Sequence, residues 1–232
     1  NQLIKTGLDE QDSRIADIGN QLYPFTSTGE FGGWFNGRNN LDVAGNSFVV
    51  LELEQLKSKP ELQRVVLLQL IYQIQQEMYL GERQQRKVLV IDEAWSLIGS
   101  DSGAVGDFVE TGYRRFRKYN GCAITVTQGI NDLYNTSSGA AIAENSATTM
   151  LLKQKGQTID SVRQQQRLPL NDAGYDLLKT VHTRPGHYSE IFFLTDAGAG
   201  IGRLIVSRFQ QLMYSTNPTE VSQIETLMKN GL

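Results

Sequence analysis

The sequence has 232 residues, of which 40% are hydrophobic and 20% charged, a balance typical of a globular protein and unlike that of a disordered segment. No apolar run approaches the roughly 20 residues of a membrane-spanning helix, and a net charge of −3 argues against a general nucleic-acid coat, which is basic. The single cysteine, Cys122, excludes an internal disulfide. Its place in the apolar run 122–126 predicts a buried, inert thiol.

Patterns of apolar residues predict helices and strands that alternate along most of the chain. Residues 9–22 have the periodicity of a short helix, and residues 24–45 are rich in glycine, asparagine and turns. A strand is predicted at 47–53, followed by a helix that Ser58 caps and that runs to about residue 80. Further strands are predicted at 88–91, 123–126, 149–153, 188–194 and 201–208, and further helices at 106–119, 140–148, 161–167, 171–180 and 217–231.

This alternation predicts an α/β fold with a mainly parallel sheet that helices cover on both faces. The last two strands flank the glycine-rich run 196–200, which predicts an antiparallel hairpin near the C-terminus, because no helix follows closely enough for a phosphate loop. We expect a lead-in helix and turn region at 1–46, a sheet-and-helix core at 47–208, and a helical tail at 209–232.

Two adjacent carboxylates follow the apolar run 88–91. Asp92 and Glu93 therefore come at the end of a buried strand, and in open α/β sheets ligands bind beyond the carboxyl ends of the strands. Asp92 can hold a magnesium ion, directly or through water, and Glu93 can polarise an attacking water as a general base. The alternative is a strand that simply ends in two solvated acids.

A second polar pair closes the next buried strand. Thr127 and Gln128 follow the run 123–126, and a glutamine at such a place can sense the terminal phosphate of a nucleotide and orient water without titrating. Taken alone, Gln128 is better explained as a helix cap or turn residue. Two neighbouring buried strands that both end in such pairs favour a nucleotide site.

A basic segment lies between the two strands and includes Arg114, Arg115, Arg117 and Lys118. Arginine is suited to spreading charge over a transferring phosphoryl group, including from a neighbouring subunit. The alternative for Arg117 and Lys118 is a solvated basic helix end, which the helix dipole favours. Arg114 and Arg115 are expected at the surface or in structural ion pairs. Since the motif at 117–121 closes the helix between the two strands, we expect the side chains of Arg117 and Lys118 near the ligand edge of the sheet.

Together these segments resemble the TraC-type conjugation ATPases of type IV secretion systems, within the RecA-like HerA/FtsK motor superfamily. The resemblance rests on residues 88–95 as the Walker B strand, on 117–121 as the basic motif, and on Thr127 and Gln128 at the next strand end. Residues 29–35 also look like the turn that, in that family, precedes the strand predicted here at 48–52. The likeness runs through nearly the whole chain.

The resemblance implies a RecA-like P-loop NTPase fold and a hexameric ATPase at the cytoplasmic face of a bacterial inner membrane. ATP and Mg²⁺ would be its cofactors, and the implied partners are further copies of the chain, other type IV secretion components, and transferred DNA or pilin. Its implied site residues are Glu93, Gln128, Arg117 and Lys118 as catalytic groups, with Asp92 and Thr127 at the nucleotide and metal.

One departure from the family pattern is large. No Gly-x-x-x-x-Gly-Lys-[Ser/Thr] phosphate loop occurs in the sequence. In the family this loop lies upstream, so we expect it to precede Asn1, and we do not expect these residues alone to bind ATP well.

Two other functions stay open on the sequence. A DNA translocase or helicase of the same superfamily would be favoured by basic pore loops, of which this acidic chain has no obvious example. A non-catalytic docking module would have no use for a water-activating base, so the presence of Glu93 counts against it.

Overall fold

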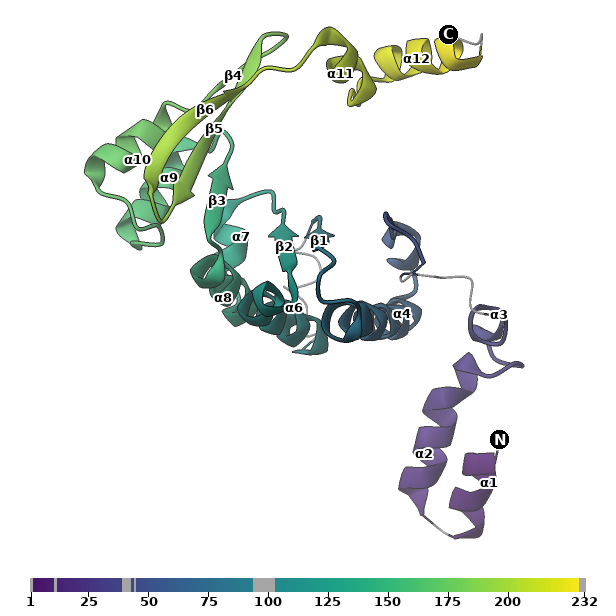
Figure 1. Cartoon of the computed structure of the whole chain (residues 1–232). Coiled ribbons are helices and arrows are strands. Elements are labelled where there is room, and N and C mark those ends of the chain that lie inside the picture. The colour runs from purple at the N-terminus through teal and green to yellow at the C-terminus, as the bar shows by residue number, and fades with distance from the viewer. Residues whose placement is uncertain (1, 11, 39–42, 44, 94–102, 230–232) are drawn as a thin grey trace. The chain divides into compact units, whose positions relative to one another are not determined.

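The structure is a computed structural model that describes residues 2–10, 12–38, 43, 45–93 and 103–229, without the side chains of residues 8 and 104 (Figure 1). The chain divides into two compact units, Asn1–Gln85 and Arg86–Leu232. Each unit is described by itself. The division between residues 85 and 86 differs from the expected boundaries at 46–47 and 208–209, which stay predictions.

The first unit begins with a helical hairpin of α1 (Gln2–Asp9) and α2 (Ser13–Leu22). The helix predicted over 9–22 is confirmed in outline by α2, but it begins at Ser13, because Asp12 caps it by accepting the Arg14 backbone N–H at 2.9 Å. The helix α1 was not predicted. The two helices approach so closely that a Cβ at Gly7 would lie 2.4 Å from the Ala16 nitrogen. A glycine is therefore required at this crossing.

Short helical turns and one long helix complete the first unit. They are η1 (Tyr23–Phe25), α3 (Gly32–Phe35), η2 (Glu54–Leu56), α4 (Pro60–Gln75) and η3 (Gln76–Leu80). Phe31, Leu56 and Leu62 form its small core. The predicted helix over 58–80 is confirmed in outline, but it begins at Pro60 and Ser58 does not cap it.

The strand predicted at 47–53 is absent from the described part of this unit. A strand is stable only when a neighbour satisfies its backbone N–H and C=O groups, and the described residues of the first unit provide no such neighbour. Phe48 is 84% exposed as a result.

The second unit opens with a parallel pair of strands, β1 (Lys87–Ile91) and β2 (Gly121–Thr125). The helix α6 (Gly103–Arg115) and the turn η4 (Phe116–Tyr119) connect back to β2. Asn120 adopts a left-handed conformation with φ 54° and turns the chain into β2. These elements confirm the predicted strands and helix, with shifts of a few residues at their ends.

One face of the parallel pair is largely exposed. Val88 and Val90 are 62% and 58% exposed, and Ile124, which is opposite Val90, is 46% exposed. Cys122 lies on the same face and is also exposed, so the prediction of a buried thiol is wrong. The apolar run correctly predicted a strand, but the described residues cover only the face that α6 approaches.

The second sheet is antiparallel and consists of β3 (Thr148–Leu151), β4 (Thr183–Arg184), β5 (Tyr188–Thr195) and β6 (Gly198–Leu204). β5 pairs with β3, β4 and β6. The predicted hairpin is confirmed, but the expectation of one mainly parallel sheet is wrong for the described residues. The strands β3 and β5 are antiparallel although two helices, at 156–164 and 172–179, lie between them in the sequence, so alternation of helices and strands did not fix strand direction here.

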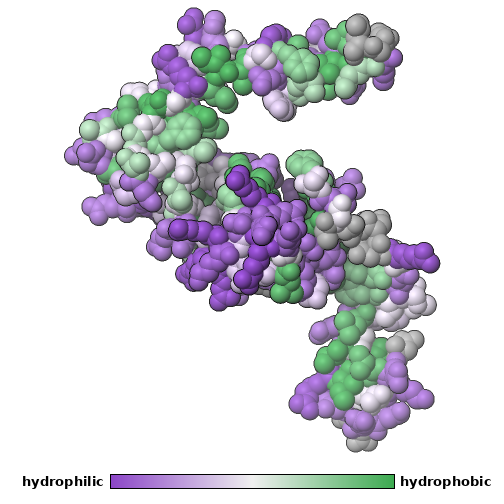
Figure 2. All heavy atoms as spheres, in the orientation of Figure 1, coloured by the Kyte–Doolittle hydropathy of each residue, from purple (hydrophilic) through white to green (hydrophobic). Residues whose placement is uncertain are grey.

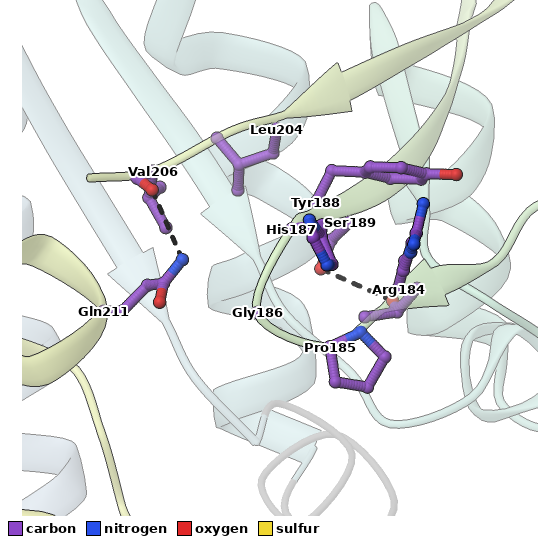
Figure 3. A pocket seen from close by; sticks show the side chains of 10 residues that line it. Arg184, Pro185, Gly186, His187, Tyr188, Ser189, Leu204, Val206 and Gln211 are labelled. Atoms are coloured by element: carbon purple, nitrogen blue, oxygen red, sulfur yellow. Dashed lines mark hydrogen bonds between the residues drawn. The ribbon is translucent and has the colours of Figure 1, made fainter. Parts of the chain in front are cut away.

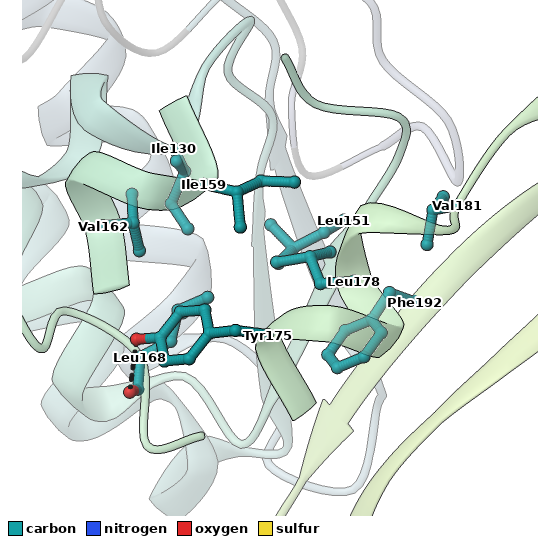
Figure 4. Packing of buried hydrophobic residues seen from close by; sticks show 9 residues of the cluster. All are labelled: Ile130, Leu151, Ile159, Val162, Leu168, Tyr175, Leu178, Val181 and Phe192. Carbon is teal, nitrogen blue, oxygen red and sulfur yellow. Dashed lines mark hydrogen bonds between the residues drawn. The ribbon is translucent and has the colours of Figure 1, made fainter. Parts of the chain in front are cut away.

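The helices α9 (Gly156–Gln164) and α10 (Asp172–Lys179) pack on this second sheet and bury the main core, to which α7 (Ile130–Tyr134) contributes Ile130. The helix α8 (Ser137–Asn145) packs instead against α6 and α7. Figure 4 shows the side chains that meet in this core, which are Ile130, Leu151, Ile159, Val162, Leu168, Tyr175, Leu178, Val181 and Phe192. Their burial supplies the hydrophobic driving force for this part of the fold.

Two further helices, α11 (Arg208–Met213) and α12 (Pro218–Lys229), end the described chain. A salt bridge of 2.8 Å between Arg208 and Glu220 joins them. Figure 2 shows apolar side chains gathered over the segment between β6 and α12, where Ile205, Phe209 and Tyr214 are exposed. No helix among the described residues is long and apolar enough to cross a membrane.

Candidate functional site

The parallel strand pair brings both predicted polar pairs to one edge. Ile91 lies opposite Thr125, and the Val126 N–H donates to the Ile91 carbonyl at 2.9 Å, so both strands end at the same level. Asp92 and Glu93 follow β1 directly, while Thr127 and Gln128 follow β2. The expected meeting of the two strand ends is therefore present in the structure.

Glu93 has an unusual backbone conformation. Its φ of 48° lies in the left-handed region, which residues other than glycine rarely adopt. The Asp92 carboxylate accepts the Glu93 backbone N–H at 2.9 Å and supports this bend. Such departures cluster at functional sites, and this one turns the chain sharply where the strand ends. Residues 94–102, which include the rest of the predicted Walker B segment, lie outside the described residues.

The chain around Gln128 is held on its downstream side by two hydrogen bonds to Gly129. The Thr127 hydroxyl donates to the Gly129 carbonyl at 3.2 Å, and the Asp132 carboxylate accepts the Gly129 N–H at 2.9 Å. Asp132 belongs to the first turn of α7. Gln128 itself is exposed at the bend between β2 and α7. The residue is thus a turn residue by position, and its side chain faces solvent at the strand edge.

Arg117 and Lys118 lie at the other end of the strands. They belong to η4, which immediately precedes β2, and the Lys87 N–H donates to the Asn120 carbonyl at 3.0 Å at the start of β1. The expectation that they emerge near the ligand edge is not met within one subunit. A segment that leads into a parallel strand lies at its amino end, and five residues of strand separate that end from the other by about 16 Å. Both side chains are exposed.

A tyrosine that the sequence patterns did not single out lies beneath β2. The Tyr113 hydroxyl, carried by α6, donates to the Thr125 hydroxyl at 2.7 Å. Burial raises the pKa of Tyr113 above its ordinary value, and the hydrogen bond to Thr125 opposes part of this rise. The sequence signal was present, since Thr125 falls on the half-buried face of β2 where an apolar residue would be usual.

A second unpredicted cluster surrounds Glu190, a buried carboxylate in β5. Arg203 donates through Nε at 3.1 Å, and the His182 ring nitrogen Nδ1 lies 2.9 Å from the other carboxylate oxygen. The Arg203 guanidinium also stacks 4.5 Å from the Tyr188 ring centre. Burial would raise the pKa of Glu190, but the hydrogen bonds from Arg203 and from the His182 backbone outweigh it and lower that pKa.

A shallow hollow of about 150 Å³ lies beside the turn between β4 and β5 (Figure 3). Arg184, Tyr188, Leu204 and Gln211 are among its lining residues. The lining contains none of the residues predicted for the nucleotide site. The hollow is therefore separate from the strand ends.

The strand ends fit a magnesium ion only in part. No group of three or more histidine, cysteine, aspartate or glutamate side chains that could hold a metal exists in the described parts of the chain. Magnesium in nucleotide sites, however, is usually bound by one or two carboxylates together with phosphates and water. Asp92, exposed at the strand end, meets this smaller requirement.

Comparison with known proteins identifies the family of the whole chain. The family model of the TraG P-loop domain matches residues 1–231. The chain belongs to the TraG P-loop domain family. This result confirms the resemblance to TraC-type conjugation ATPases that the Walker B strand, the basic motif and Thr127-Gln128 suggested.

This TraG P-loop domain is similar to two known proteins, one in sequence and one in structure. The chain is 30% identical to the protein TraC of Escherichia coli strain K12 over 227 aligned residues. This alignment covers 95% of this chain and 26% of TraC. The chain is also similar in structure to VirB4 of Thermoanaerobacter pseudethanolicus, with a TM-score of 0.64 and 20% sequence identity over 90% of this chain and 54% of that chain. The second likeness shows the fold alone. The chain spans about a quarter and about half of these relatives.

Membership of a P-loop family implies nucleotide binding. The finer assignments, which concern ATP, magnesium, the roles of individual residues and the partners, are proposals.

Proposed function

We propose that this TraG P-loop domain is part of an ATP-hydrolysing motor that powers conjugative pilus assembly, or DNA or protein transfer, through a type IV secretion system. The observation that carries the proposal is the convergence of Asp92-Glu93 and Thr127-Gln128 at one edge of a parallel strand pair, in a chain of this family. Carboxylate and amide side chains at that edge are what water activation and phosphate sensing need.

Each side chain receives a distinct task in this proposal. Asp92 would hold Mg²⁺, which neutralises charge on the phosphates when it is bound. Glu93 accepts a proton from the attacking water, and Gln128 orients that water beside the terminal phosphate. Thr127 lies next to Gln128 and contributes to the nucleotide-binding edge.

Arg117 and Lys118 cannot reach the strand ends of their own subunit from the amino edge of β2. In the proposed hexamer they act across a subunit boundary, where an arginine stabilises charge in the transition state. The proposed partners are further copies of the chain, other secretion components at the cytoplasmic face of the inner membrane, and the transferred DNA or pilin. A DNA translocase or helicase is the second candidate, because it shares this fold and the same strand-end chemistry.

The test is Glu93→Gln in the full-length protein. The amide keeps the shape of the side chain but cannot accept the proton, so hydrolysis should fall by roughly 100-fold or more while nucleotide affinity stays nearly unchanged. Steady-state turnover and equilibrium binding of a fluorescent ATP analogue measure the two quantities.

Glu225→Gln in α12 is the matched control, since it makes the same substitution at an exposed glutamate outside the predicted site. If the Glu93→Gln protein keeps more than about a tenth of wild-type turnover, which corresponds to ~1.4 kcal/mol of barrier, Glu93 is not the base.

A further inference from the structure

Gln128 lies on a short segment that is fixed at both ends. Upstream, β2 pairs with β1 through the Val126 N–H and the Ile91 carbonyl. Downstream, the turn is closed on Gly129 by Thr127 and Asp132. Any displacement of β2 along the sheet or out of it therefore moves the Gln128 side chain as well.

Tyr113 is placed to prevent such a shift. It reaches from α6 to β2, where its hydroxyl donates to the Thr125 hydroxyl at 2.7 Å, three residues before Gln128. Thr125 is also the residue opposite Ile91, the last residue of β1 before Asp92 and Glu93. This one hydrogen bond thus ties the helix to the level of the sheet at which both polar pairs begin.

The bond also lies in a protected environment. Thr125 is half-buried on the face of β2 toward α6, and Tyr113 is half-buried as well. A hydrogen bond shielded from water is stronger and more directional than an exposed one. Loss of the Tyr113 hydroxyl would leave the Thr125 hydroxyl without this donor in a site with restricted access to water.

We propose that Tyr113 is a positioning residue that holds the Thr127-Gln128 strand end in the geometry required for hydrolysis, acting through Thr125. This inference rests on the proposed function of the same site.

The experiment uses four variants of the full-length protein. Tyr113→Phe removes only the hydroxyl, Thr125→Val removes only the acceptor, and the double variant removes both. Thr125→Ser keeps a hydroxyl at the same place and tests for rescue. Tyr175→Phe is the matched control, because it also deletes a buried tyrosine hydroxyl, one that donates to the Leu168 carbonyl at 3.1 Å in the core of the antiparallel sheet.

We expect Tyr113→Phe and Thr125→Val each to lower kcat roughly 5- to 20-fold with KM for ATP nearly unchanged, since a small displacement of a catalytic side chain costs turnover rather than binding. The double variant should be no worse than the more impaired single variant, since both remove the same bond. Thr125→Ser should recover most of the turnover, and Tyr175→Phe should resemble wild type.

A second measurement does not depend on turnover. Hydrogen exchange followed by mass spectrometry should show faster exchange of the amides at 126–129 in Tyr113→Phe, and no change there in Tyr175→Phe. The proposal would be overturned if Tyr113→Phe kept the wild-type kcat and the wild-type exchange rates. It would also be overturned if the losses of kcat in the two single variants added up in the double variant, or if Tyr175→Phe lost as much kcat as Tyr113→Phe.

Failure of this proposal is distinguishable from failure of the proposed function. If Glu93→Gln abolishes hydrolysis but Tyr113→Phe leaves kcat intact, the site is catalytic and Tyr113 does not position it. If Glu93→Gln leaves hydrolysis intact, the proposed function itself fails.

Discussion

Glu190 shows how one buried charge can depend on its neighbours. Arg203, the His182 ring and the His182 backbone all contact its carboxylate, and together they lower its pKa below the ordinary value of 4.5. A carboxyl group whose pKa is lower in the folded state stabilises the fold above its unfolded pKa and loses that contribution as the pH falls through the folded pKa.

We therefore expect Glu190→Gln to lower the melting temperature at pH 7, because the amide cannot replace the ionised acceptor. The difference from wild type should begin to shrink as the pH falls below 4.5, the ordinary pKa of the unfolded carboxyl, and should be lost as the pH falls through the lower pKa of the folded one. Thermal unfolding monitored by circular dichroism across this range measures the effect. Glu144→Gln at an exposed site of α8 serves as the control. An unchanged gap at pH 3 would contradict the assignment.

Arg117 gives a second prediction at the residue scale. Its position at the amino edge of β2 separates it from its own subunit's carboxylates, so any catalytic role requires a neighbouring subunit. Arg117→Ala should then lower turnover by at least about tenfold with little change in nucleotide affinity, since an arginine of this kind acts in the transition state. Arg114→Ala is the control, because Arg114 is engaged by Glu110 at 2.7 Å.

Mixed oligomers test whether Arg117 acts across a subunit boundary. Combining Arg117→Ala with Glu93→Gln subunits leaves some interfaces with an intact Glu93 beside an intact Arg117, so activity should partly return. No recovery in oligomers that demonstrably exchange subunits would contradict a catalytic role for Arg117 across that boundary. Unchanged turnover in Arg117→Ala would return the segment to a solvated basic helix end.

At the scale of the element, the parallel pair β1–β2 has one face that the described residues leave exposed. Cys122 lies on that face beside Val88 and Ile124, and it is the sole cysteine of the sequence. Thiol reactivity therefore reports on this face directly.

We expect Cys122 of the 232-residue chain to react with a disulfide reagent such as dithionitrobenzoate at a rate within about tenfold of the unfolded chain, because exposure controls access. Absorbance at neutral pH, with and without denaturant, measures both rates. Cys122→Ser provides the blank. Strong protection in the native chain would mean that this face of β1–β2 is covered.

At the scale of the whole molecule, the missing phosphate loop limits what these 232 residues can do. Backbone N–H groups and a lysine of that loop hold the nucleotide phosphates in P-loop proteins, and the sequence contains no such loop. The chain does supply carboxylates, Thr127 and Gln128 at the strand edge, and in the proposed function these act on phosphates that other groups hold.

We therefore expect the isolated 232-residue chain to bind ATP very weakly and to show no turnover. Calorimetric titration with ATP and magnesium measures the affinity, and the full-length protein in the same buffer provides the comparison. Micromolar affinity in the isolated chain would contradict this expectation and would point to a phosphate-binding surface among the residues present.

The sequence by itself determined the local features of this protein. Four apolar residues in a row predicted the strand β1, and the polar pairs Asp92-Glu93 and Thr127-Gln128 at two predicted strand ends identified the candidate site. Glycine-rich residues predicted the hairpin of β5 and β6. These features depend on neighbours close along the chain, so periodicity and turn chemistry are sufficient to find them.

Only the tertiary structure decided the features that depend on distant partners. The direction of β3, the exposure of Cys122, the absence of a strand at 47–53 and the burial of Glu190 are all set by which elements pair and which faces are covered. Likewise, the separation of Arg117 and Lys118 from the carboxylates follows from strand polarity in the folded sheet. Pairing and burial are properties of residues brought together from far apart in the sequence, and short-range patterns do not encode them.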